Sequence, residues 1–271
     1  MTRVAAIDCG TNTIRLLIAD LVRDGAGGVR LTAVRRTNEI VRLGQGVDRT
    51  GRLDDAALAR TLDVVRDYAA ACAELGVDLA GGRGRFVATS ATRDASNRED
   101  FVEGVRAVLG IEPEVISGRE EARLSFAGSL LGADGGGAFP GADAGHAAGP
   151  TGPGDAAGPD AAAGSEADIR PDAAGTRRLV TDLGGGSTEL VLGVDAPAAA
   201  YSMNTGSVRV TERYLADGVT PASEAAARGH VRALLERAGA VVDLGAAREL
   251  VGLAGTITTV TAHALGLESF E

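Results

Sequence analysis

Two segments of the chain repeat one order of residues that suits phosphate binding. Each has an apolar stretch that ends in an aspartate, then a turn of glycine and hydroxyl residues, then a second apolar stretch, at 6–13 and at 180–189. Glycines let backbone N–H groups approach an anion closely, and hydroxyl side chains add further donors. The candidate phosphate-binding residues are therefore Gly10, Thr11 and Thr13 in the first turn, and Gly184, Gly185, Gly186, Ser187 and Thr188 in the second.

The aspartates before these turns, Asp8 and Asp182, suit a different ligand. A carboxylate does not bind phosphate directly, because both groups are anions. It is, however, a good ligand for a divalent cation, either directly or through water. Two such turns that face each other would hold a phosphate chain together with Mg²⁺.

A third segment, 252–256, combines an apolar run with a Gly-Thr turn at the expected start of a helix. The free N–H groups and the positive end of the helix dipole favour an anion there. Gly255 and Thr256 are the candidate phosphate-binding residues of this turn. The alternative is that the turn only leads from a strand into a helix.

The basic and sulfur-containing residues exclude several kinds of site. All 27 basic residues are arginine, which excludes a P-loop lysine and a lysine Schiff base. His146, His230 and His263 lack the spacing of metal ligands. Cys9 and Cys72 form no CxxC pair, which fits a reduced, cytoplasmic compartment, although a disulfide between them stays open.

Length and charge narrow the class of protein further. The 271 residues suit two domains or one large one, and 3% aromatic residues require a core of Ala, Val, Leu and Ile. The net charge of −10 disfavours nucleic acid and anionic membranes as partners. The longest apolar-looking stretch, 250–267, contains Gly, Thr and His, so we expect no membrane span.

The segment 132–175 has an unusual composition. It consists mainly of Gly, Ala, Pro and Asp and carries a net charge of −6, which leaves −4 on the rest of the chain. Such a segment cannot bury enough apolar surface to offset the entropy of ordering it, so we expect a disordered insertion. An interaction tail and a tolerated surface insertion are the two interpretations.

Apolar periodicity and turn signals elsewhere predict alternating strands and helices. A helix is expected over 54–75, with Cys72 on its apolar stripe and therefore in the core. The other expected helices are 97–109, with Asn97 as its cap, one that begins at 117, 207–215, and 221–238, with Thr220 as its cap. The expected strands are 4–9, 14–21, 29–36, 40–43, 86–89, 114–116, 179–183, 190–194 and 251–254.

Four segments in this order resemble the exopolyphosphatase and guanosine pentaphosphate phosphohydrolase family, called Ppx/GppA, of the actin-like superfamily. They read DCGTNT at 8–13, TSATR at 89–93, SGREEA at 117–122 and DLGGGSTE at 182–189. The resemblance implies an α/β fold of two ribonuclease-H-like (actin-like ATPase) domains with the site in the cleft between them. On this basis we expect domains over 1–117 and 118–271, the second holding the disordered insertion and C-terminally incomplete, since family members usually continue.

The resemblance also implies an activity and a set of site residues. It implies an Mg²⁺-dependent hydrolase that removes the terminal phosphate of polyphosphate or guanosine pentaphosphate. Glu121 matches the family's catalytic glutamate, and Asp182 and Glu189 match its magnesium-associated carboxylates, with Asp8 nearby. Its phosphate-contacting groups match Asn12, Arg93, Gly185, Gly186 and Ser187. Related proteins often form dimers, so the sequence leaves a homodimer as one of the alternatives for the oligomeric state.

The residue types agree with these catalytic roles. Ser117 and Glu120 have the spacing of a capping box, which leaves Glu121, about 100° further round the helix, free to point elsewhere. At an ordinary pKa of about 4.3, Glu121 is ionised at neutral pH and can accept a proton from attacking water. Arg93, expected where a buried strand runs into a loop, could hold a phosphoryl oxygen and stabilise developing charge.

Two other functions remain alternatives. A kinase of the same superfamily would need an acceptor-binding domain and a base aimed at a substrate hydroxyl, and the sequence shows no obvious acceptor site. A non-catalytic sensor of polyphosphate or guanosine pentaphosphate would keep the glycine turns without needing Glu121. Both phosphate chains present a terminal phosphoanhydride to the same loops, so both stay candidate substrates.

Overall fold

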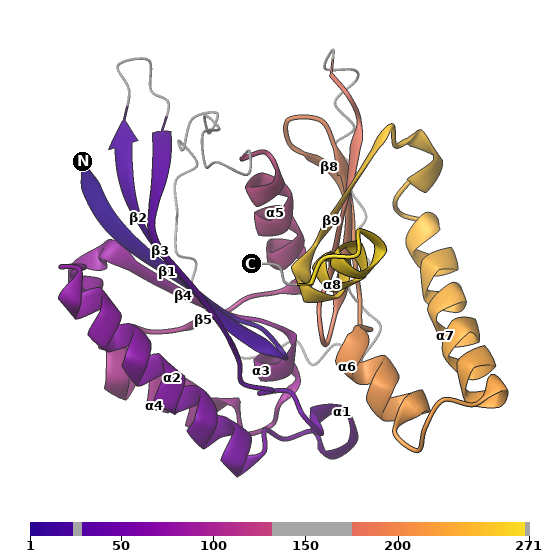
Figure 1. Ribbon diagram of the computed structural model, residues 1–271, viewed down its shortest axis with the longest axis horizontal. Coiled ribbons are helices and arrows are strands. Elements are labelled where there is room, and N and C mark those ends of the chain that lie inside the picture. Colours follow the sequence, from indigo (N-terminus) through magenta and orange to yellow (C-terminus); the bar gives the residue numbers. More distant parts are fainter. Residues whose placement is uncertain (24–28, 132–174, 269–271) are drawn as a thin grey trace.

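Two mixed sheets lie side by side in the computed structural model (Figure 1). The structure describes residues 1–23, 29–131 and 175–268. The insertion predicted over 132–175 lies outside the described residues apart from Gly175.

The first sheet has the strand order β3-β2-β1-β4-β5. β1, β2 and β3 form an antiparallel meander, and β4 and β5 continue the sheet parallel to β1. Its strands are β1 (Thr2–Cys9), β2 (Thr13–Arg23), β3 (Val29–Ile40), β4 (Gly84–Ala88) and β5 (Glu114–Val115).

The second sheet repeats the first four positions of this arrangement, in the order β8-β7-β6-β9. Its strands are β6 (Arg178–Leu183), β7 (Thr188–Gly193), β8 (Pro197–Met203) and β9 (Glu249–Leu253), with β9 parallel to β6. β6 thus corresponds to β1, and each begins a hairpin whose turn carries one of the two repeated segments. The predicted α/β class with two related sheets is confirmed; the domain boundary after residue 117 stays a prediction.

Helices cover both sheets (Figure 1). α2 and α4 pack on one face of the first sheet, whereas α5 and α7 cover opposite faces of the second. The α-helices are α1 (Val47–Thr50), α2 (Asp55–Glu74), α3 (Ser90–Asp94), α4 (Arg98–Leu109), α5 (Gly118–Ser129), α6 (Ser207–Val210), α7 (Pro221–Gly239) and α8 (Ala254–Ala264). Shorter helical turns span Leu79–Arg83, Thr211–Leu215 and Leu244–Ala246. Among the described helices, none combines the length and apolar character needed to cross a membrane.

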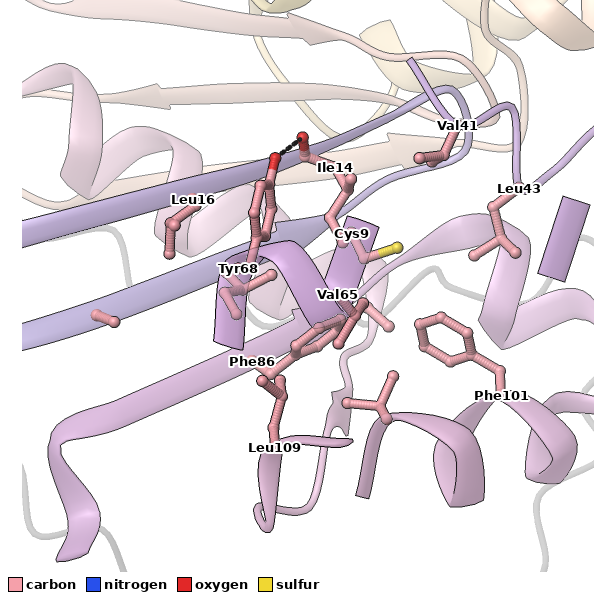
Figure 2. Close-up of a cluster of buried hydrophobic side chains, with 14 of the residues drawn as sticks. Cys9, Ile14, Leu16, Val41, Leu43, Val65, Tyr68, Phe86, Phe101 and Leu109 are labelled. Atoms are coloured by element: carbon pink, nitrogen blue, oxygen red, sulfur yellow. Dashed lines mark hydrogen bonds between the residues drawn. The ribbon is translucent and has the colours of Figure 1, made fainter. Parts of the chain in front are cut away.

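The core of the first sheet is aliphatic with a few aromatic rings (Figure 2). Phe86 of β4 meets Phe101 of α4 edge to face, with ring centroids 6.0 Å apart. Cys9 and Cys72 are both buried and both free thiols, so the disulfide left open by the sequence is not formed and the core position of Cys72 is confirmed.

The second sheet has a core on each face because side chains alternate along its central strand. Val191 of β7 faces Ala122 and Phe126 of α5, whereas its neighbour Leu190 packs with Leu234 of α7. The contact through Ala122 and Phe126 fixes α5 on the sheet. Glu121 is thereby held at the N-terminal end of a helix that cannot easily move.

The strand expected over 40–43 is wrong. β3 runs without a break to Ile40, and Val41 and Leu43 are buried in an irregular turn instead. Polar residues within β3 do not interrupt it, because β3 is an edge strand with much of its surface exposed. The chain leaves the sheet at Arg42, whose positive φ of 52° is incompatible with a strand.

β8 and α3 are among the elements that were not expected. β8 is rich in alanine, a poor strand former, and forms because it pairs with β7. The short helix α3 follows β4 directly, so Arg93 lies on a helix and not where a strand runs into a loop. Asn97 does precede α4 as expected, but its amide bonds the backbone of Leu53 and does not cap the helix.

The buried hydroxyl of Tyr68 offers a test of the first core. It donates a hydrogen bond of 3.0 Å to the carbonyl of Ile14 in β2 (Figure 2). We expect Tyr68→Phe to lower the free energy of unfolding by about 1 kcal/mol, because one buried hydrogen bond is lost without a cavity. Urea denaturation measures this. Tyr201→Phe is the matched control, since the Tyr201 hydroxyl bonds no described residue; equal losses would contradict the assignment.

Candidate active site

A cavity of about 550 Å³ lies between the glycine turns of the two sheets. Its lining joins segments far apart in the sequence, and it contains the turn residues from both hairpins and from the start of α8. The predicted site residues that line it are Asp8, Gly10, Thr11, Asn12, Thr13, Glu121, Asp182, Gly184, Gly185, Gly186, Ser187, Gly255 and Thr256.

The two hairpin turns are built alike. In the first, the Gly10 N–H donates to the Thr13 carbonyl at 2.9 Å, and in the second the Gly184 N–H donates to the Ser187 carbonyl at 3.1 Å. These two N–H groups therefore close their own turns and are not free for a ligand. The N–H groups of Gly185 and Gly186 donate to no acceptor within the described residues, which leaves them available to an anion.

The turns approach each other so closely that only glycine fits. A Cβ on Gly186 would lie 2.4 Å from Oγ1 of Thr11 and 2.6 Å from Oγ of Ser90. On the other side of the second turn, a Cβ on Gly206 would lie 2.5 Å from the carbonyl of Gly185. The second turn is therefore enclosed between the first turn and the start of α6.

Carboxylates converge on the same cavity. Asp8 at the end of β1 and Asp182 near the end of β6 both line it, as does Glu121 of α5. Asp8 has 47% of its side-chain surface exposed and lies 3.7 Å from Nη1 of Arg15. Asp182 accepts a hydrogen bond of 2.5 Å from the Ser125 hydroxyl, one turn beyond Glu121 on α5.

The surroundings of Glu121 raise its pKa to about 7. Burial is the largest cause, since only 16% of the side chain is exposed. Arg93, whose Nη1 lies 3.4 Å from Oε2 of Glu121, acts in the opposite direction, and the charges of Asp182 and Asp8 raise the pKa further. Burial and like charge thus outweigh the arginine, which gives a carboxylate poised to exchange a proton near neutral pH.

Two further carboxylates are shifted in the same direction. Loss of bulk water inside the cleft raises the pKa of Asp8, although its side chain is half-exposed to the cavity; Arg15 lowers this pKa, and Asp182 raises it again. Burial and the charge of Glu121 raise the pKa of Glu189 well above its ordinary value. Only 1% of Glu189 is exposed, and its Oε1 accepts a hydrogen bond of 2.7 Å from Ser202.

Three predicted site residues do not line the cavity. The Thr188 hydroxyl is buried and donates to the carbonyl of Thr205 at 2.7 Å, so it faces away from a ligand. Glu189 pairs with Asp182 across the hairpin but is almost fully buried, so it does not line the cavity. Arg93 reaches Glu121 from outside the lining, and its Nη1 also donates to the carbonyl of Ile116 at 2.8 Å.

Some lining residues were not expected from the sequence. Arg15 and Asn38 form one cross-strand row with Asp8, because Asp8 pairs with Arg15 and Arg15 pairs with Asn38. The register of the predicted hairpin could have indicated Arg15. The remaining unexpected side chains with donors or acceptors are Thr89, Ser207, Thr258 and Thr259. Thr258 and Thr259 reach the cavity because they lie about one turn beyond the start of α8. The first residue of this helix, Ala254, has a positive φ of 69°.

The donor set suits a divalent cation that is shared with a phosphate ligand. Within the described residues, no three His, Cys, Asp or Glu side chains form a ready-made metal site. Mg²⁺ is, however, usually held by one or two carboxylates together with water and substrate phosphates. Asp8 and Asp182 supply two carboxylates that crowd each other at the edge of the cavity, and a cation there would relieve their repulsion.

The two sheets share the order of four strands, and each carries a glycine hairpin that lines the common cleft. This arrangement defines the actin-like ATPase fold. Within this fold, a profile of the Ppx/GppA phosphatase family matches residues 21–136 and 169–265. The chain belongs to the Ppx/GppA phosphatase family.

Individual relatives agree with this assignment. Exopolyphosphatase 2 of Mycobacterium tuberculosis is 44% identical over 279 aligned positions, which span 100% of this chain and 73% of that protein. The crystal structure of an exopolyphosphatase-like protein superposes with a TM-score of 0.75 and 38% identity. The superposition covers 100% of this chain and 71% of that one. For the Aquifex aeolicus Ppx/GppA family member, the TM-score is 0.62 and the identity 26%, with 100% and 72% of the two chains covered.

The close approach at Gly206 predicts a specific steric effect. We expect Gly206→Ala to displace the second glycine turn and to cost about 1–3 kcal/mol of stability, because the new methyl group meets backbone atoms that cannot rotate away. Thermal unfolding measures the change. Gly229→Ala, in the middle of α7 with no atom near its Cβ position, is the control and should be neutral or stabilising. Gly206→Ala at wild-type stability would show that the turns are not held this tightly.

The raised pKa of Glu121 predicts that this residue reduces stability. An acid whose pKa is higher in the folded than in the unfolded state destabilises the fold when it is ionised. For Glu121 this effect is fully present above about pH 7 and disappears below the unfolded pKa near 4.5. In metal-free buffer at pH 8, Glu121→Gln should therefore raise the free energy of unfolding by up to about 3 kcal/mol. Denaturation at pH 8 and at pH 4 measures the difference.

Glu112→Gln is the control for this measurement. Its hydrogen bond with Arg106 lowers the pKa of Glu112, so loss of the charge there should not stabilise the protein. A destabilised Glu121→Gln protein at pH 8 would contradict the assigned burial of Glu121.

Proposed function

We propose that the protein is a divalent-cation-dependent exopolyphosphatase, which releases the terminal phosphate of inorganic polyphosphate with Glu121 as general base. Guanosine pentaphosphate is the second candidate substrate, because it also presents a terminal phosphoanhydride. The observation that carries the proposal is that Glu121, a carboxylate with a pKa of about 7, lines the same cavity as the second glycine turn, whose Gly185 and Gly186 N–H groups are free. The naming of the Mycobacterium tuberculosis relative as exopolyphosphatase 2 supports polyphosphate as the substrate.

Hydrolysis requires that water attack the terminal phosphorus while the bridging oxygen leaves. The ionised Glu121 accepts a proton from this water as the new P–O bond forms, and the bridging P–O bond breaks. The products are inorganic phosphate and a chain shortened by one unit. Base catalysis of this kind contributes about 10²–10⁴-fold in rate.

Charge stabilisation is assigned to the surroundings of the phosphoryl group. The N–H groups of Gly185 and Gly186 would bind its non-bridging oxygens. Arg93 has a double role in this proposal, since it orients Glu121 and supplies positive charge beside it. The turn of Gly255 and Thr256 at the start of α8 lies on the same cavity and would hold a further phosphate of the chain.

Mg²⁺ would be held by Asp8 and Asp182. When bound, it would neutralise the charge of phosphate oxygens, which these carboxylates alone would repel. Glu189, buried and paired with Asp182 across the hairpin, is proposed to act through Asp182 and not as a direct ligand. We keep the cytoplasm as the proposed compartment, since both thiols are free.

The kinase and the sensor are the weaker alternatives. A kinase would transfer the phosphoryl group to a substrate hydroxyl, whereas the similar proteins are named as an exopolyphosphatase and a Ppx/GppA family member. A sensor would gain nothing from a buried carboxylate that reduces stability. The pKa of Glu121 therefore favours the enzyme.

Phosphate release tests the proposal. With Mg²⁺ and long-chain polyphosphate, the wild-type protein should release phosphate, and Glu121→Gln should lower kcat by at least about 100-fold while the substrate is still bound. EDTA should abolish release. The same assay with guanosine pentaphosphate ranks the two substrates.

Glu120→Gln is the matched control. Glu120 pairs with Arg123 and Arg85 on the outside of α5, so its loss should leave kcat within about twofold of wild type. Release by Glu121→Gln at the wild-type rate would overturn the base assignment. Absence of release by folded wild-type protein from either substrate would favour the sensor.

A further inference from the structure

Arg209 of α6 is buried where the two sheets meet, outside the cavity. Only 7% of the residue is exposed. Its Nε donates to the carbonyl of Gly186 at 2.6 Å and its Nη1 to Oδ1 of Asp48 at 2.5 Å. Its Nη2 donates to the Ser90 hydroxyl at 3.2 Å and to Oδ2 of Asp94. One guanidinium group thus satisfies four acceptors from three segments of the chain.

Each of these acceptors belongs to a part of the chain that builds the active site. Gly186 lies in the second glycine turn. Ser90 and Asp94 are the first and last residues of α3, the helix that carries Arg93. Asp48 lies in α1, which directly follows the loop 41–46.

The loop 41–46 in its turn holds the first glycine turn. The N–H groups of Val41 and Arg42 both donate to the carbonyl of Asn12, at 3.0 and 2.9 Å, and the Gly44 N–H donates to the carbonyl of Thr11 at 2.8 Å. Arg209 is therefore connected through Asp48 to the first turn and directly to the second.

We propose that Arg209 is a positioning residue for the reaction, which fixes the separation of the two glycine turns and the orientation of α3. The inference rests on the proposed phosphohydrolase function. In this role Arg209 touches no substrate; it keeps Glu121 and Arg93 aligned with a phosphate held between the turns. A misplacement of about 1 Å costs on the order of 100-fold in rate.

The chemistry of the site explains why arginine is required. The planar guanidinium donates in several fixed directions at once, whereas the ammonium group of lysine is a compact charge on a flexible stem. Lysine could pair with Asp48 or Asp94 but could not also bond the Gly186 carbonyl and Ser90 in the same geometry. We therefore expect Arg209→Lys to impair the site almost as much as replacement of Arg209 by an uncharged residue.

Arg213 provides a matched control. Its guanidinium also donates to Asp48, but 33% of its side chain is exposed and it bonds neither glycine turn nor α3. Arg213→Gln removes one arginine from the same aspartate and leaves the contacts with Gly186, Ser90 and Asp94 intact.

Two readouts test the proposal in the full chain. For polyphosphate hydrolysis, Arg209→Lys and Arg209→Gln should each lower kcat per folded molecule by about 10- to 100-fold with KM within about threefold, whereas Arg213→Gln should keep kcat within about twofold. In hydrogen exchange of the substrate-free protein, both Arg209 variants should speed exchange of the hydrogen-bonded N–H groups of Gly10 and Gly184 by about tenfold or more, and Arg213→Gln should not.

The outcomes separate the two proposals. If the wild-type protein releases no phosphate, the proposed function fails, and hydrogen exchange still decides whether Arg209 fixes the turns. An active wild type with Arg209 variants of unchanged kcat, or with unchanged exchange at both turns, would overturn the positioning role. Should Arg209→Gln fail to fold, Ser90→Ala removes one bond of the same group and should give a smaller decrease in kcat, of about threefold to tenfold; an unchanged kcat there would also overturn it.

Discussion

The site depends on carboxylates that the fold removes from bulk water and forces close together. Loss of bulk water raises the pKa values of Asp8, Glu121 and Glu189, and the charge of Asp182 raises all three further. Arg93 and Arg15 oppose these shifts only in part. An arrangement of this kind reduces stability unless a cation and a proton are taken up, and the proposed hydrolysis uses both.

The fold produces this crowding by using one arrangement twice. β1 and β6 each carry an aspartate beside a glycine hairpin, and the two turns pack against each other at Gly186. Because the turns touch, both aspartates reach one cavity. α5 then brings Glu121 to it while Phe126 and Ala122 hold the helix on the second sheet. The Ser125 hydroxyl joins the base-bearing helix to Asp182.

The sequence predicted the parts that local patterns encode. The repeated turns, the helices over 54–75 and 221–238 and the cavity position of Glu121 follow from spacing and from four short segments. It did not predict β8, whose alanines form a strand only through pairing, or α3, which is too short to show periodicity. Nor did it predict Arg209, because its four acceptors lie between 23 and 161 residues away in the chain.

The structure of Glu121→Gln bound to a short polyphosphate and Mg²⁺ would test the central claim most directly. The account predicts that the terminal phosphoryl group lies between 10–13 and 184–187, within hydrogen-bonding distance of the N–H groups of Gly185 and Gly186. A cation should lie on Asp8 and Asp182, and the amide that the substitution introduces on α5 should face the phosphorus opposite the bridging oxygen. A terminal phosphate bound away from both turns would contradict the account.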